Sequence, residues 1–124
     1  MPRVMHFEIS AEEPERAAKF YAEAFGWKVQ KWESPMDYWM LITGDEGEPG
    51  INGGMMKKCD EHPMPGTVNT ITVASVDEYV GKVEAAGGKI IVPKMAIPTI
   101  GYIAYFQDTE GNMFGLMEPD TSAK

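Results

Sequence analysis

The hydrophobic pattern of the chain opens with a strand. Residues 4–10 are expected to form this strand, because apolar and polar side chains alternate from Met5 to Ser10, which is the period of a strand with one buried face. The alternation puts Phe7 and Ile9 on one face and His6 and Glu8 on the other. Two polar, titratable side chains are therefore expected to share a face of the first strand.

Two amphipathic helices follow at separate places in the sequence. Pro14 suits the first turn of a helix, and Gly26 suits its left-handed end. Apolar residues between them recur at helical spacing. Ser75 and Glu78 form a capping box at the start of the second helix, and the glycines at 87–88 end it.

The remaining apolar runs predict short strands, separated by glycine-rich and proline-rich turns. Their expected ranges are 27–32, 38–43, 51–57, 67–74, 89–92, 102–106 and 113–117. Residues 93–98 are expected to be irregular, 108–111 to form a tight turn, and 59–66 to be a linker. The order is βαβββ, linker, βαβββ.

This order indicates an internal duplication. Adding 62 to each position aligns the two halves without a gap, placing Ile9 on Ile71, Gly26 on Gly88 and Gly53 on Gly115. Helix starts, glycine stops and apolar positions coincide. We therefore expect an α+β fold of two tandem βαβββ modules in one domain over 1–124, with module one at 1–58, the linker at 59–66 and module two at 67–120.

Composition limits the kinds of binding partner and the cellular compartment that are expected for the chain. The 124 residues carry a formal net charge of −8, which disfavours binding to nucleic acid or to anionic lipid. No apolar run is long enough to span a bilayer, and the first ten residues lack the features of a signal peptide. Cys59 is the only cysteine, which fits a reducing, cytoplasmic environment.

Four segments carry a resemblance to a known superfamily. They are HFEISAEEPERAAKFYAEAFGW at 6–27, GGMMK at 53–57, VDEYVGKVEAAGGKIIVPK at 76–94 and GYIAYFQDTEGNMFGLMEPD at 101–120. In this order they resemble the vicinal oxygen chelate superfamily, which includes glyoxalase I, extradiol dioxygenases and the bleomycin and fosfomycin resistance proteins. More narrowly, the chain resembles small proteins related to lactoylglutathione lyase. The resemblance implies a glyoxalase-like domain with a central cavity, and a homodimer.

The same resemblance implies metal ligands on the first and fourth strands of each module. The corresponding positions are His6, Gly53, Val68 and Gly115. Only His6 has a side chain that coordinates a metal, whereas a useful divalent centre needs at least three protein groups. We therefore expect no metal cofactor, the alternative being Zn, Ni or Fe with His6 as a ligand. Cys59-x-x-His62 has no second pair and indicates linker composition.

Candidate site residues follow from these positions. His6 and Glu8 are the candidate catalytic pair, in which Glu8 would raise the pKa of the imidazole; a buried polar pair without chemistry is the alternative. Glycine at the ligand positions would remove side-chain volume from the cavity. Flexible and aromatic side chains would then bind a small, largely apolar molecule. The residues expected to do so are Trp39, Met55, Tyr102 and Met117.

Three functions remain open from the sequence. The first is a glyoxalase-like protein that binds a small apolar or aromatic molecule without the usual metal, with His6 as acid–base residue if it is an enzyme. The second is a metal-dependent lyase, isomerase or dioxygenase with His6 as a ligand. The third is a resistance protein that sequesters a drug or toxin without chemistry. The scaffold itself does not decide among them.

Overall fold

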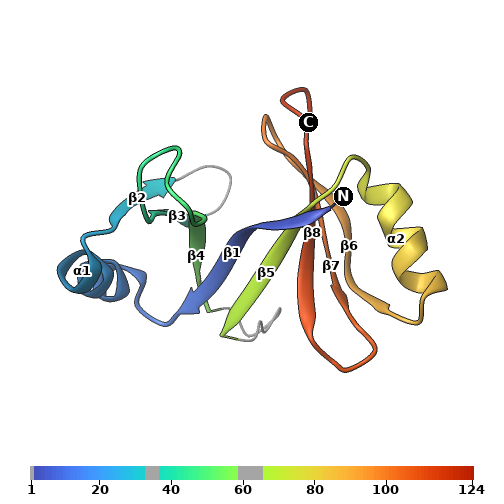
Figure 1. The fold of residues 1–124 in the computed structure, drawn as a ribbon, viewed down its shortest axis with the longest axis horizontal. Coiled ribbons are helices and arrows are strands. Elements are labelled where there is room, and N and C mark those ends of the chain that lie inside the picture. The colour runs from blue at the N-terminus through green and yellow to red at the C-terminus, as the bar shows by residue number, and fades with distance from the viewer. Residues whose placement is uncertain (1, 33–36, 59–65) are drawn as a thin grey trace. The chain divides into compact units, whose positions relative to one another are not determined.

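The computed structural model of the chain describes residues 2–32, 37–58 and 66–124 (Figure 1). The chain divides into two compact units. The first-module unit is His6–Val68, and the second-module unit is Asn69–Lys124 together with Met1–Met5. The expected linker at 59–66 lies outside the described residues except for Gly66.

Each unit contains one helix and the strands of one βαβββ module, except that residues 3–5 and 67–68, which begin the first strand of each module, belong to the other unit. In chain order the elements are β1 (Arg3–Ala11), α1 (Pro14–Phe25), β2 (Lys28–Trp32), β3 (Tyr38–Ile42), β4 (Gly53–Lys57), β5 (Thr67–Thr72), α2 (Val76–Ala85), β6 (Lys89–Ile97), β7 (Gly101–Gln107) and β8 (Met113–Pro119). The predicted α+β fold of two βαβββ modules is confirmed. None of the described helices is long and apolar enough to cross a membrane.

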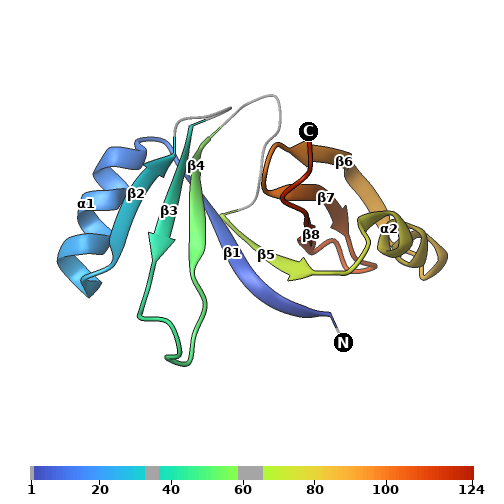
Figure 2. The same ribbon diagram turned by 90° about the horizontal axis from the view of Figure 1, so that it is seen from above.

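The strands of the first-module unit run in the order β2-β3-β4-β1. β1 pairs with β4 in parallel, and the other neighbours are antiparallel. Helix α1 lies along these strands in Figure 2. Buried Trp39, Leu41 and Met55 form the core on this side, against which Ala17 and Ala18 of α1 pack. The helix thus covers one face of the sheet and leaves the other for side chains such as His6.

The second-module unit repeats this arrangement with the order β5-β8-β7-β6. β5 and β8 are parallel, whereas β6 and β7 each pair antiparallel with the next strand. Buried Val76, Ala104 and Leu116 belong to the core beneath α2. Every second residue of β7 and β8 therefore faces the helix, and the residues between them face the other way.

The helix ends follow the sequence signals. Pro14 opens α1, and Gly26 closes it with φ of 74°. Ser75 Oγ accepts a hydrogen bond of 3.1 Å from the backbone N–H of Glu78. The carboxylate of Glu78, expected to reach back to the cap, instead lies 3.7 Å from Lys82 Nζ. The start of α2 is thus capped by Ser75, and Glu78 supports the first turn along the helix surface.

Two strand details differ from the sequence prediction. Residues 93–97, expected to be irregular, belong to β6, which tolerates Pro93 by shifting register between Ile90 and Val92 and again between Val92 and Met95. Such shifts let a strand continue past a residue that cannot donate to the ladder.

The second difference concerns the spacing of the repeat. Glu8 lies opposite Gly54 on the β1–β4 ladder, and Thr70 lies opposite Gly115 on the β5–β8 ladder. The first strands are therefore offset by 62, but the fourth strands by 61. The counterpart of Gly115 is Gly54, and not Gly53 as the gapless alignment predicts.

Candidate functional site

Three polar side chains of the first-module unit form a chain of hydrogen bonds. His6 and Glu8 project from the same face of β1, as the alternation predicts, and Tyr38 is the first residue of β3. His6 Nε2 lies 2.8 Å from the Tyr38 hydroxyl, and that hydroxyl donates to Glu8 Oε2 at 3.2 Å. The structure thus brings the predicted pair together through a third residue, the phenol of Tyr38.

Burial dominates the electrostatics of this group. Glu8 is only 5% exposed, and His6 and Tyr38 are half-buried. Desolvation lowers the pKa of His6 below 6.5 and outweighs the opposing effect of Glu8. The expected rise in the pKa of His6 is therefore wrong in direction. Burial, followed by the charge and hydrogen bond of Glu8, raises the pKa of Tyr38. The imidazole and the phenol are both neutral near pH 7.

Glycine at position 54 makes room for the phenol. A Cβ built on Gly54 would overlap the Tyr38 hydroxyl and the ring carbon that carries it. A Cβ on Gly53 would instead lie 2.5 Å from the ring of Phe7, on the face of β1 opposite Glu8. The space left by the missing side chain at 54 is therefore filled by Tyr38, and does not enlarge a cavity as the sequence suggests.

The second-module unit shows a related arrangement without the histidine. A Cβ on Gly115 would lie 3.1 Å from Thr70 Oγ1 and 3.2 Å from Tyr105 Cε1. Thr70 occupies the position of Glu8, and its hydroxyl is buried without a hydrogen-bond partner in the described part of the chain. Both fourth-strand glycines thus have a tyrosine close to them, but only the first module combines it with an imidazole and a carboxylate.

The residues expected to bind a ligand are divided between the two sheet faces. Trp39 and Met55 are buried in the core beneath α1, and Trp39 Nε1 donates to Glu15 of that helix at 3.1 Å. They face away from His6 and Glu8, because Met55 lies opposite Ile9 on the ladder. Trp39 and Met55 therefore do not share the sheet face of the predicted catalytic pair.

Tyr102 and Met117 lie in the second-module unit. Tyr102 packs against the core beneath α2, with Lys94 Nζ 4.5 Å from its ring centroid. Met117 lies opposite Ile103 and is two residues from Gly115, so it shares the face of Gly115. Of the four expected ligand-binding residues, Met117 alone faces away from a helix-covered core.

The donor set does not fit a divalent centre of the kind the family resemblance implies. Among the described residues there is no group of three or more His, Cys, Asp and Glu side chains that could hold a metal ion. The strand register assigns Gly54, and not Gly53, to the fourth-strand ligand position of the first module. The four ligand positions are then His6, Gly54, Val68 and Gly115, and only His6 has a side chain that can coordinate a metal. Moreover, Nε2 of His6 is already engaged with Tyr38. Cys59 and His62 lie outside the described residues.

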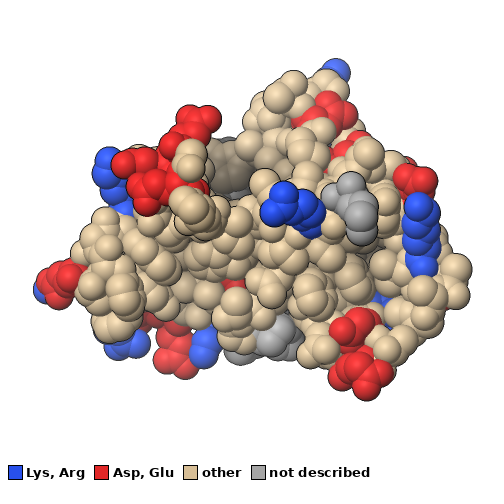
Figure 3. All heavy atoms as spheres, viewed as in Figure 1, with Lys and Arg blue, Asp and Glu red and all other residues tan. Residues whose placement is uncertain are grey.

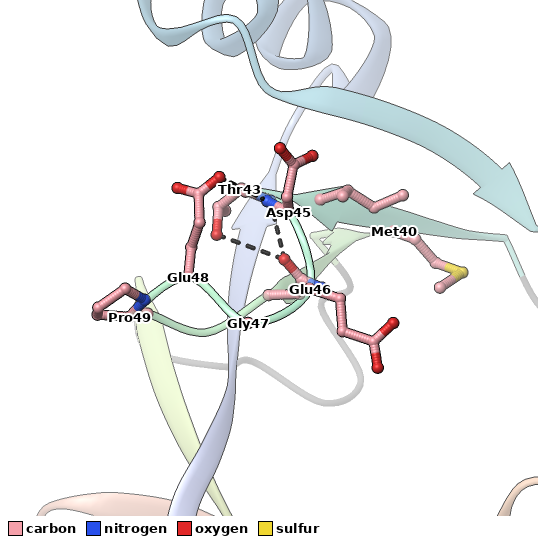
Figure 4. A pocket seen from close by; sticks show the side chains of 11 residues that line it. Met40, Thr43, Asp45, Glu46, Gly47, Glu48 and Pro49 are labelled. Atoms are coloured by element: carbon pink, nitrogen blue, oxygen red, sulfur yellow. Dashed lines mark hydrogen bonds between the residues drawn. The ribbon is translucent and has the colours of Figure 1, made fainter.

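A separate hollow of about 480 Å³ lies at the loop between β3 and β4 (Figure 4). Its polar groups largely bond within the loop: the backbone N–H of Asp45 donates to Glu48 Oε1 at 3.1 Å, and that of Thr43 to Asn52 Oδ1 at 2.9 Å. Carboxylates gather over this loop on the face seen in Figure 3. The hollow holds no histidine or cysteine, so it offers less chemistry than the His6 group.

Comparisons with a family model and with individual relatives point to the same group of proteins. A family model described as the Glyoxalase/Bleomycin resistance protein/Dioxygenase superfamily matches residues 3–116. A glyoxylase-like domain-containing protein of Didymella fabae is 32% identical over 114 residues, which cover 89% of this chain and 88% of that protein. CFP32 of Mycobacterium bovis, provisionally named a glyoxylase, is 30% identical over 118 residues. The match covers 90% of this chain but only 42% of CFP32.

Solved structures share the fold at low sequence identity. Methylmalonyl-CoA epimerase from Mycobacterium tuberculosis has a TM-score of 0.71 at 16% identity, covering 94% of this chain and 87% of the epimerase. Hypothetical protein BH1468 from Bacillus halodurans has a TM-score of 0.74 at 16% identity, covering 99% and 98%. At this identity the likeness concerns the fold alone.

Proposed function

The chain belongs to the Glyoxalase/Bleomycin resistance protein/Dioxygenase superfamily, and from that premise we propose that it binds a small, largely apolar molecule at the His6 face and transfers a proton without a divalent metal. The observation that carries this proposal is the hydrogen-bond chain from His6 through Tyr38 to Glu8. His6 is the acid–base residue, and Tyr38 and Glu8 hold it in place.

The state of the histidine supports a role as a base. Its pKa lies below 6.5 because it is desolvated, so the ring is neutral and able to accept a proton at pH 7. The imidazolium that forms is stabilised through the phenol by the buried carboxylate of Glu8. The reaction class that fits is removal of a proton from carbon beside a carbonyl and its return to the same or a neighbouring atom, as in an isomerase.

The charge of the group supports an uncharged substrate. Among the described residues, Glu8 is the only charged side chain whose field contributes to the pKa shifts of both His6 and Tyr38. The charge of a buried carboxylate disfavours an anionic ligand beside it in a medium of low dielectric constant. Methylmalonyl-CoA, the substrate of the structurally similar epimerases, carries several negative charges and therefore fits this group less well than an uncharged molecule does.

The test compares two probes and two variants. Phenylacetone is a neutral aromatic ketone with exchangeable protons, and methylmalonyl-CoA is the anionic comparison. Deuterium uptake from D₂O is measured by mass spectrometry for the wild-type chain, His6→Gln and Tyr21→Phe, after chelator treatment and metal analysis. Tyr21 stacks on Trp27 in the same unit, so Tyr21→Phe is the control for a general change in the unit.

We expect exchange of phenylacetone that survives chelation, is lost in His6→Gln and is kept in Tyr21→Phe. If chelation abolishes the exchange and added Zn, Ni or Fe restores it, the metal-dependent alternative is correct. Binding of phenylacetone, seen as protection against thermal unfolding, without any exchange would show a sequestering protein.

A further inference from the structure

One consequence of the Tyr38 contact concerns the two nitrogens of the His6 ring. The Tyr38 hydroxyl has a single proton, and it lies within hydrogen-bond distance of both Glu8 Oε2 and His6 Nε2. The hydroxyl donates this proton to Glu8 Oε2, because a carboxylate oxygen accepts hydrogen bonds. The phenol oxygen then offers only lone pairs to the imidazole. His6 Nε2 must therefore be the ring nitrogen that carries the hydrogen.

We propose that Tyr38 is a positioning residue that fixes neutral His6 in the tautomer protonated at Nε2, and that glycine at position 54 is required for Tyr38 to do so. The acceptor nitrogen of the ring is then Nδ1, which becomes the atom that takes the substrate proton. This inference rests on the proposed function for its use in catalysis, but the tautomer itself is a property of the free protein.

The requirement for glycine follows from the strand register. Gly54 lies opposite Glu8 on one side and opposite Met40 on the other. Any side chain at this position would start at the place that the Tyr38 hydroxyl occupies. The phenol would have to leave, and both of its hydrogen bonds would break together. The position that the family resemblance assigns to a metal ligand thus holds a phenol supplied by β3.

Alternative arrangements of the proton are less favourable. If Tyr38 donated to His6 instead, its oxygen would face the Glu8 carboxylate at 3.2 Å with no proton between them, which leaves two lone-pair-bearing oxygens in contact at a buried site. The raised pKa of Tyr38, caused first by burial and then by Glu8, indicates that the phenol keeps its proton.

The tautomer is observable directly, because the chain has only two histidines. Nitrogen-15 NMR of the full chain labelled at histidine separates a protonated from an unprotonated ring nitrogen, and a His62→Gln variant assigns the signals of His6. At pH 8 we expect the wild-type His6 ring to show the Nε2-protonated pattern alone. In Tyr38→Phe, which loses the hydroxyl but keeps the ring, we expect a mixture of the two tautomers.

A matched pair of glycine variants separates the specific effect from general crowding. Gly54→Ala should shift the His6 tautomer as Tyr38→Phe does. Gly53→Ala adds the same methyl on the other face, against Phe7, and should leave the tautomer unchanged. If Gly54→Ala does not fold, Tyr38→Phe alone decides.

Kinetic measurements then connect the tautomer to turnover. With phenylacetone as the probe, Tyr38→Phe should lower kcat for deuterium exchange about tenfold or more, since a misoriented base loses much of its general-base contribution, with a smaller change in KM. A wild-type tautomer pattern that survives in Tyr38→Phe would overturn the inference. A different outcome is that the tautomer depends on Tyr38 while His6→Gln keeps full deuterium exchange. That pair of results would refute the proposed function and leave the inference about the tautomer intact.

Discussion

His6 is a half-buried base whose neutral form is favoured by its surroundings. Desolvation works against the imidazolium, and the carboxylate that would favour it is separated from the ring by the Tyr38 hydroxyl. A histidine in such a place binds its proton less readily when the protein is folded than when it is unfolded. The residue therefore couples the stability of the fold to pH.

We expect the free energy of unfolding to fall as pH drops below about 6.5, the ordinary pKa of histidine. Below that value His6 is protonated in the unfolded chain but remains largely neutral in the folded one, because its pKa is lower in the folded state. Acid therefore favours the unfolded state. Urea titrations between pH 5 and pH 8, above the pH range in which Asp108 and Asp120 affect stability, measure the slope. His6→Gln should flatten it; an unchanged slope in this variant contradicts the assignment.

The sequence predicts part of this site and misses the rest for a physical reason. Alternation along β1 is a local property, so it correctly placed His6 and Glu8 on one face. The contact with Tyr38 spans 32 residues and depends on how β3 pairs with β4, which local alternation does not determine. For the same reason, the sequence did not show that Trp39 and Met55, which were predicted to bind a ligand, lie in the core beneath α1. The adjacent glycines at 53–54 were the sequence signal that another side chain packs closely against β4.

At the scale of elements, the helix ends and glycines are the best-predicted features. Pro14, Gly26 and Ser75 act as expected, because capping depends on residues close in sequence. Strand β6 was predicted too short, since Pro93 normally ends a strand and two register shifts were not foreseeable from composition. The fourth-strand offset of 61 also escaped the gapless alignment, because both candidate positions are glycine.

Ser75→Ala should destabilise the protein by about 0.5–2 kcal/mol, because the N–H of Glu78 loses the hydroxyl that accepts its hydrogen bond. Thermal or urea unfolding measures the loss. Ser75→Asp is the matched control: it keeps an acceptor at the cap and a favourable charge at the helix start, and should retain most of the stability. Equal losses in the two variants would contradict a capping role.

Gly81→Ala should stabilise the protein by about 0.5–1 kcal/mol. Gly81 lies within α2, has no positive φ, and an added Cβ would meet nothing within 4 Å. Alanine therefore keeps the helix and reduces the conformational freedom of the unfolded chain. The same denaturation experiment measures the gain. A loss of stability would show that position 81 has a contact that the structure does not include.

At the scale of the whole molecule, the two units have separate cores but share strands. Trp39, Leu41 and Met55 form one cluster, whereas Leu116 lies in the other. β1 and β5 each begin in one unit and continue into the other. A continuous strand cannot unfold in one unit without fraying in the next, so we expect the units to unfold together.

Tryptophan fluorescence offers a test of this coupling, because all three tryptophans fall in the first-module unit. Leu116→Ala, in the core of the other unit, should cost about 2–5 kcal/mol and lower the urea midpoint equally by fluorescence and by far-ultraviolet circular dichroism. Leu41→Ala is the matched variant in the tryptophan-containing unit. A fluorescence midpoint that stays at its wild-type value in Leu116→Ala would show independent units.

The overlap between Gly54 and the Tyr38 hydroxyl also restricts how this protein can change over evolutionary time. A tyrosine at position 38 in this conformation and a side chain at position 54 exclude each other, so the two positions should covary among relatives although they are distant in the sequence. A lineage acquiring a carboxylate at 54, where the family resemblance assigns a metal ligand, must lose the phenol first or in the same step. Relatives should accordingly divide into a glycine-with-tyrosine class and a carboxylate-without-tyrosine class, with few sequences between them.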